Sequence, residues 1–259
     1  MAFAGHTRRA FDSDLQILSQ NLAEMGVLAE RQVADAIAAL TNGDKTTARR
    51  LVAIDVAVDA LQRTIDARVV EMIARRQPVA VDLRQVLSIL RIANELERIG
   101  DLAKNIGKRV LALRAEDMRH RAMPRVACMA AVMSSRLREV LDSFEHHDPR
   151  LAVDVWLRDE EVDSLCKSLS HEILSCMRED PRAVTLGTHL LFCTKNLERM
   201  GDHATNIAEA VYYMVEGRRL LGERPKVDVT NMMSAEWSGL SHHPRASTGS
   251  VRSVGVNGL

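Results

Sequence analysis

Residues 97–101 read Glu-Arg-Ile-Gly-Asp and residues 198–202 read Glu-Arg-Met-Gly-Asp, so one pentapeptide pattern occurs twice, 101 positions apart. Asn105-Ile106 returns as Asn206-Ile207 at the same spacing. The apolar residues around the two motifs repeat with them: Ile89, Ile92, Leu96, Ile99, Ala103, Ile106 and Val110 correspond to Leu190, Cys193, Leu197, Met200, Ala204, Ile207 and Val211. Polar and apolar patterns that recur together indicate a duplicated structural unit.

A second acidic motif lies upstream of each pentapeptide. The pattern Asp-x-x-x-Asp occupies residues 55–59 and again residues 159–163, at a spacing of 104 positions. The two spacings differ because the first half is longer between its motifs. We place this difference at the turns predicted by Gln77-Pro78 and Asp180-Pro181, where a change of length costs little.

Gly and Pro residues divide the chain into six long stretches. In the first stretch, apolar residues recur at intervals of three and four, as on one side of a helix. The expected helices cover residues 8–41, 44–76, 80–116, 122–146, 149–178 and 182–218. Asp44, Asp148 and Asp180 stand where an aspartate is favourable at a helix N-terminus.

Short connections between long helices are typical of antiparallel helix bundles. Together with the repeat, they predict an all-α fold of six long antiparallel helices, arranged as two tandem three-helix bundles. The first unit covers residues 8–118 and the second covers residues 119–222. Residues 223–259 are polar and aperiodic, so we expect a disordered tail there.

The composition favours helices and excludes several classes of protein. Of the 259 residues, 46% are hydrophobic and 27% charged, but only 3% are aromatic, which argues against a β-sandwich or barrel. The 35 basic and 35 acidic residues cancel, so we expect no direct nucleic-acid binding. No apolar run reaches the roughly 18 residues of a membrane span, and we see no secretory signal peptide.

Four cysteines lie in the helical patterns and form no Cys-x-x-Cys pair. We therefore expect buried thiols in a reducing cytoplasm rather than disulfides. The four are Cys128, Cys166, Cys176 and Cys193.

The repeated carboxylates are the candidate functional residues. Residues four apart share one face of a helix, so Glu97 and Asp101 are neighbours, and their line falls nearly opposite the apolar seam. We expect this line to face outward and to meet the Asp55–Asp59 line on one surface. Like charges at this spacing repel by about 0.2–0.5 kcal/mol per pair, and a bound cation would reverse that cost. Carboxylate and amide oxygens suit Mg²⁺, Ca²⁺, Mn²⁺ or iron.

Two other interpretations of these acids stay open. Acidic pairs on a helix are often a solvated face, and the basic residues Arg98, Lys104, Lys195 and Arg199 stand close enough to neutralise them. A di-iron oxidoreductase is disfavoured because the Glu-x-x-His motif of those bundles does not occur in the chain. His203, one position after Asp202, lies about 100° further round the helix, and we interpret it as a polar flank or a packing residue rather than a metal ligand.

The segments Glu-Leu-Glu-Arg-Ile-Gly-Asp-Leu-Ala-Lys-Asn-Ile (residues 95–106) and Asn-Leu-Glu-Arg-Met-Gly-Asp-His-Ala-Thr-Asn-Ile-Ala-Glu (residues 196–209) resemble the paired signature of the PhoU family. The resemblance covers about residues 8–220 and implies an all-α fold of two three-helix bundles. It also implies multinuclear metal clusters, of iron, manganese, magnesium or zinc, on the acidic motifs. By matching position, the metal ligands would be Asp55, Asp59, Glu97, Asp101, Asp159, Asp163, Glu198 and Asp202. One departure is Leu102, where the second unit has His203, the form closer to the family pattern.

The resemblance implies a regulatory function without a catalytic step. Such a protein would be a cytoplasmic negative regulator of the phosphate-starvation (Pho) regulon and a modulator of phosphate uptake. It would act as a metal-binding adaptor between the ATPase subunit of a phosphate ABC transporter and a phosphate-sensing histidine kinase, and would reach the membrane only through these partners. Long bundles with an exposed flank often pair, so we expect a homodimer. The alternatives are a metal-dependent enzyme and a metal-free helical scaffold.

Overall fold

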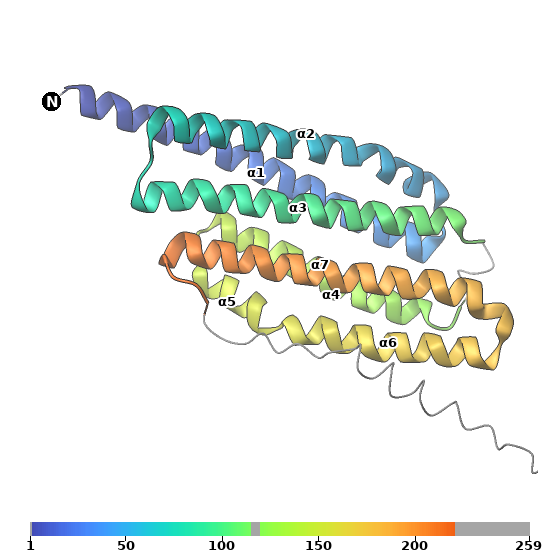
Figure 1. The fold of residues 1–259 in the computed structure, drawn as a ribbon. Coiled ribbons are helices and arrows are strands. Elements are labelled where there is room, and N and C mark those ends of the chain that lie inside the picture. Colours follow the sequence, from blue (N-terminus) through green and yellow to red (C-terminus); the bar gives the residue numbers. More distant parts are fainter. Residues whose placement is uncertain (1, 115–119, 221–259) are drawn as a thin grey trace, which may run out of the picture. The chain divides into compact units, whose positions relative to one another are not determined.

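The computed structural model describes residues 2–114 and 120–220, which form helices and short connections without a strand (Figure 1). Six of the helices are long, and this confirms the predicted all-α fold. In chain order the elements are α1 (Ala2–Asn42), α2 (Lys45–Arg76), α3 (Ala80–Ala112), α4 (Met123–Glu145), α5 (Pro149–Leu157), α6 (Asp159–Glu179), the 3-10 turn η2 (Pro181–Ala183) and α7 (Val184–Glu216).

The fifth predicted helix is interrupted. Instead of one helix over residues 149–178, α5 and α6 meet at Arg158, which leaves helical geometry with φ −92° and ψ 11°. Asp159, Glu160 and Glu161 fill the first turn of α6, and negative charge stabilises a helix N-terminus. The acids therefore favour a new helix start at this point.

Two further predictions concern the ends of elements. Helix α3 ends at Ala112 rather than at residue 116, because Leu113 turns to an extended conformation. The predicted boundary between residues 118 and 119 and the predicted disordered tail at 223–259 lie outside the described residues.

The predicted aspartates cap their helices. Asp44 Oδ1 accepts hydrogen bonds from the backbone N–H groups of Thr46 (2.9 Å) and Thr47 (3.1 Å). Asp148 caps α5 in the same way, and Asp180 caps η2. These bonds satisfy N–H groups that have no partner within the helix.

The apolar frame that repeats in the sequence forms the core. Ile92, Leu96 and Ile99 of α3 are fully buried, as are Leu197 and Met200 of α7. Helix α3 packs against α1 and α2, and α7 packs against α4, α5 and α6. Helices α3 and α7 also lie side by side (Figure 1), so the described parts of both halves share one hydrophobic core.

One cysteine departs from the prediction of buried thiols. Cys166, Cys176 and Cys193 are buried, but Cys128 is exposed on α4. The buried side of α4 carries Val126, Met129, Ala130 and Met133, and position 128 lies beside that stripe rather than in it.

The glycines of the repeated pentapeptide make room for side chains of neighbouring helices. A Cβ atom on Gly100 would lie 2.7 Å from Oε1 of Gln32 in α1, and one on Gly201 would lie 3.3 Å from Cγ1 of Val162 in α6. Both glycines are buried, and the space beside them is filled by these side chains rather than by an ion or a neighbouring backbone.

Gln32 provides a test of this packing. The residue is fully buried, and its amide nitrogen and oxygen have no hydrogen-bond partner among the described residues. Because an unpartnered buried polar group costs about 1–3 kcal/mol, Gln32→Met should raise the free energy of unfolding by about 1 kcal/mol, or Tm by about 2–4 °C. Thermal unfolding followed by circular dichroism measures this. Gln32→Ala, which leaves a cavity, should lower Tm, and a lower Tm for Gln32→Met would contradict the argument.

Two acidic clusters as candidate metal centres

Each half of the repeat gathers four of the predicted carboxylates between two helices. The first acidic cluster consists of Asp55 and Asp59 of α2 with Glu97 and Asp101 of α3. The second acidic cluster consists of Asp159 and Asp163 of α6 with Glu198 and Asp202 of α7. Helices α2 and α3 pack together, as do α6 and α7, so the pairs on neighbouring helices meet as the spacing predicts.

The first acidic cluster contains an ammonium group. Lys104 Nζ donates hydrogen bonds to Asp55 and Asp101, so it links α2 to α3. Partial burial alone would lower the pKa of Lys104, but the bonds to the two carboxylates outweigh it and raise that pKa. Burial raises the pKa of Glu97, and the charges of Asp101 and Asp59 add to this against the opposing effect of Arg98.

The second acidic cluster has less positive charge inside it. Burial raises the pKa of Asp163 to about 6, and the negative charges of Asp159, Glu198 and Asp202 add to the effect. Lys195 Nζ lies 2.6 Å from Glu198 Oε1, but the lysine side chain is 55% exposed. The four carboxylates therefore repel one another, and the clearest sign of this repulsion is the raised pKa of Asp163.

The acids are less exposed than the sequence indicates. Asp55 and Asp159, expected on a surface shared with the acids of the next helix, are only 6% and 3% exposed, because the adjoining helices of each pair close over them. Basic neighbours also behave as the solvated-face interpretation predicts: Arg98 Nε lies 3.4 Å from Glu97 Oε2, and lysines contact both clusters.

The second acidic cluster is suited to bind a cation because it contains carboxylate oxygens that lack a hydrogen-bond partner among the described residues. Asp159 Oδ2 and Glu198 Oε2 are buried and have no hydrogen-bond partner among the described residues. Burying a charged oxygen without a partner is costly, and carboxylate oxygens are the ligands that hard divalent cations prefer. In their present rotamers no three His, Cys, Asp or Glu side chains of residues 2–114 and 120–220 are arranged to hold one metal ion. A cation would therefore require these carboxylates to rotate toward it.

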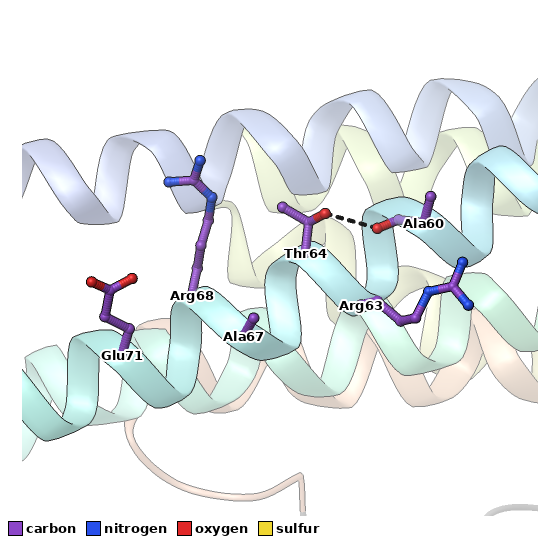
Figure 2. Close-up of a pocket in the computed structure, with 6 residues that line it drawn as sticks. All are labelled: Ala60, Arg63, Thr64, Ala67, Arg68 and Glu71. Carbon is purple, nitrogen blue, oxygen red and sulfur yellow. Dashed lines mark hydrogen bonds between the residues drawn. The ribbon is translucent and has the colours of Figure 1, made fainter.

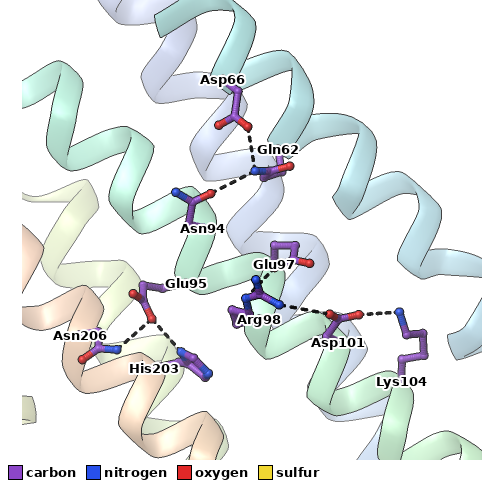
Figure 3. A network of polar contacts seen from close by, with 10 residues as sticks. All are labelled: Gln62, Asp66, Asn94, Glu95, Glu97, Arg98, Asp101, Lys104, His203 and Asn206. Atoms are coloured by element: carbon purple, nitrogen blue, oxygen red, sulfur yellow. Dashed lines mark hydrogen bonds and ion pairs between the residues drawn. The ribbon is translucent and has the colours of Figure 1, made fainter.

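A separate polar contact joins the two halves. Glu95 Oε2 of α3 lies 2.7 Å from His203 Nδ1 and accepts a hydrogen bond of 2.9 Å from Asn206 Nδ2, both on α7 (Figure 3). Burial alone would raise the pKa of Glu95, but the bonds from His203 and Asn206 lower it. The Arg109 guanidinium of α3 also stacks over the ring of Phe192 of α7, at 4.2 Å from its centroid.

Sequence reasoning missed this seam, although the repeat carries a signal for it. Glu95 corresponds to Asn196, and Leu102 corresponds to His203, so the duplicated motifs differ at these positions. At these two positions the break in the repeat coincides with the contact between the two halves.

An open depression runs along the outside of α2 (Figure 2). All of its lining residues belong to this one helix and are exposed: Ala60, Arg63, Thr64, Ala67, Arg68 and Glu71. Small-molecule sites are enclosed and mostly apolar, whereas this depression is wide open and three of its six lining side chains are charged. As for membranes, none of the described helices combines the length and apolar character that a membrane span requires.

The chain matches the PhoU domain family over residues 22–110 and 126–211. A relative from Rhizobium meliloti (strain 1021), named phosphate-specific transport system accessory protein PhoU homolog, is 44% identical over 230 residues, which cover 89% of this chain and 97% of the relative. A relative of the same name from Caulobacter vibrioides (strain NA1000 / CB15N) is 44% identical over 224 residues, covering 86% of this chain and 97% of the relative.

Two solved structures share the fold. The crystal structure of PhoU from Pseudomonas aeruginosa has a TM-score of 0.78 and 38% sequence identity, and covers 80% of this chain and 100% of its own. The phosphate transport system regulatory protein PhoU from Streptococcus pneumoniae has a TM-score of 0.76 and 29% identity, with 82% of this chain and 100% of its own covered.

The repulsion within the second acidic cluster predicts a pH-dependent stability. Since the pKa of Asp163 rises from 3.8 to about 6 on folding, the folded protein binds more protons than the unfolded chain between these values. Stability therefore falls as pH rises through this window. In chelator-treated protein, Asp163→Asn should raise Tm at neutral pH by about 2–4 °C, after allowance for partial solvent exposure.

The gain from Asp163→Asn should shrink as the pH falls from 6 toward 4, because the parent carboxyl then becomes neutral as well. Glu24→Gln, an exposed change in the middle of α1 and away from both acidic clusters, serves as the control and should leave Tm nearly constant. A gain that is independent of pH, or a loss at neutral pH, would contradict the assignment.

Proposed function

The chain belongs to the PhoU domain family, and from that premise we propose that it is an accessory protein of a phosphate-specific transport system and a negative regulator of the phosphate-starvation (Pho) regulon. The observation that carries the proposal is the family match over both halves, residues 22–110 and 126–211, each with its acidic cluster. The names of the Rhizobium meliloti relative and the Streptococcus pneumoniae neighbour support the accessory and the regulatory parts.

The proposed action is that of an adaptor. The protein would contact the ATPase subunit of the transporter and a phosphate-sensing histidine kinase in the cytoplasm, as a homodimer, and restrain the kinase when phosphate is plentiful. Long helices joined through one core provide surfaces of fixed geometry for two partners. A difference in affinity between two states of the complex would carry the signal.

A metal ion or cluster has a structural role in this proposal. Asp159, Asp163, Glu198 and Asp202 would hold it, with iron, manganese, magnesium or zinc as the candidates. The bound cation would neutralise the carboxylates and connect α6 to α7. The unpartnered oxygens of Asp159 and Glu198 support this assignment.

We propose a non-enzymatic role over a metal-dependent enzyme. The names of the relatives describe accessory and regulatory proteins, and the depression on α2 has a single wall. Hydrolysis of small phosphate esters with added Mn²⁺ or Mg²⁺, abolished by Glu198→Ala, would favour the enzyme instead. A metal-free scaffold would be favoured if untagged protein purified without chelator carried no metal above background.

The regulatory proposal predicts the output of a phosphate-starvation reporter. In phosphate-rich medium, deletion of the gene should raise alkaline phosphatase activity at least tenfold. A variant with Glu97, Asp101, Glu198 and Asp202 changed to Ala should resemble the deletion while remaining folded and abundant, because it has lost half of each acidic cluster.

The matched control removes the same number of carboxylates from exposed positions outside the clusters, Glu24, Glu145, Asp154 and Glu160, and should repress normally. Low reporter activity in the deletion strain would refute the negative-regulator proposal. Normal repression by the cluster variant would leave the regulator in place but remove the acidic clusters from its mechanism.

A further inference from the structure

One position of the duplicated motif changes the charge of the two acidic clusters. The pattern Glu-Arg-x-Gly-Asp-x-Ala is followed by Lys104 in α3 and by Thr205 in α7, and both are followed by asparagine. All four acids of each cluster are retained in the repeat, so the two clusters have the same carboxylates. They differ in the residue three positions after the last acid of the motif, which is Lys104 in the first acidic cluster and Thr205 in the second.

Lys104 already supplies a cation to the first acidic cluster. Its ammonium contacts Asp55 of α2 and Asp101 of α3 (Figure 3 shows the Asp101 contact), so it joins the two helices from which the carboxylates come. The lysine side chain is 19% exposed and that of Asp55 only 9%, so this ion pair is held within the helix interface rather than in solvent. A lysine ammonium is a compact point charge with three donors, which suits a position between several carboxylates.

Thr205 leaves the second acidic cluster without such a cation. The residue is 1% exposed, and its neutral Oγ1 donates a hydrogen bond of 2.8 Å to Asp159 Oδ1. The other oxygen of the same carboxylate, Oδ2, is buried without a partner among the described residues, as is Glu198 Oε2. Lys195 reaches only the opposite oxygen of Glu198, from the exposed side of the helix.

We propose that Lys104 takes the place of a metal ion in the first acidic cluster, so that the protein binds divalent metal at the second acidic cluster alone. The inference rests on the metal-binding part of the proposed function and makes the two halves chemically unequal. A metal ion and the Lys104 ammonium compete for Asp55 and Asp101, and the ammonium is covalently tethered beside them. At the second acidic cluster, no lysine or arginine of the described residues contacts Asp159, whose Oδ1 accepts from Thr205 and whose Oδ2 has no partner there.

The test measures Mn²⁺ binding by the full-length, untagged protein after removal of metal with chelator and desalting. The electron paramagnetic resonance signal of free Mn²⁺ gives the number of ions bound per chain. Asp159→Asn with Glu198→Gln should lose at least nine-tenths of the bound Mn²⁺. The matched first-cluster variant, Asp55→Asn with Glu97→Gln, should bind as much as the parent.

Exchanging the residue types at positions 104 and 205 should exchange the Mn²⁺ binding of the two acidic clusters. Lys104→Thr should roughly double the Mn²⁺ bound per chain, and Lys104→Arg, which keeps the positive charge, should not. Lys104→Met removes the charge but retains the length of the side chain, and it gives the same test if the threonine variant unfolds. Thr205→Lys should abolish binding, with circular dichroism establishing that the protein is folded.

The outcomes separate this inference from the proposals on which it rests. Equal loss of Mn²⁺ in the two double variants, or no gain with either Lys104→Thr or Lys104→Met, would overturn the inference while leaving metal binding in place. A parent protein that binds no Mn²⁺ would overturn both the inference and the metal role. The regulatory proposal is judged independently, by the reporter.

Discussion

Carboxylates enclosed between helices need a compensating partner, and this constraint governs how the two halves of the molecule are built. The first half meets it with the ammonium of Lys104. The second half meets it partly with the hydroxyl of Thr205, and one oxygen each of Asp159 and Glu198 has no partner within the described part of the chain. Because a buried charge is far more costly without a partner than with one, these differences are the basis for proposing an external cation at the second half alone.

The acidic clusters depend on the core that lies behind them. The apolar frame of α3 and α7 fixes the rotation of each helix, since residues such as Leu96 and Leu197 are fully buried. The acids then lie on the flank that faces α2 or α6. Small residues permit this close packing: Gly100 and Gly201 leave space for Gln32 and Val162, so the pentapeptide serves packing and charge at the same time.

The sequence was sufficient for the features that depend on local chemistry and periodicity. The helix spans, the Asp44 and Asp148 caps and the buried frame all follow from spacing and capping preferences. The interruption at Arg158 could not be predicted, because it depends on a local competition between continuing α5 and starting α6. The burial of Asp55 and Asp159 and the contact of Glu95 with His203 depend on how helices from distant parts of the chain pack, which a helical wheel does not describe. The metal-binding role of the clusters stays a prediction.

The contact between Glu95 and the pair His203 and Asn206 has a consequence for how the duplicated halves recognise each other. An exact duplicate could associate with any copy of itself, including the first half of another molecule. Glu95 finds its histidine only on α7, because the corresponding residue of α3 is Leu102. Pairing two first halves would set the partly buried Glu95 carboxylate against Leu102 instead of a histidine, so that it would lose one of its two hydrogen-bond partners and keep only the repeated asparagine. The divergence of the repeat thus favours the pairing of the two different halves of one chain over the pairing of like halves from two chains.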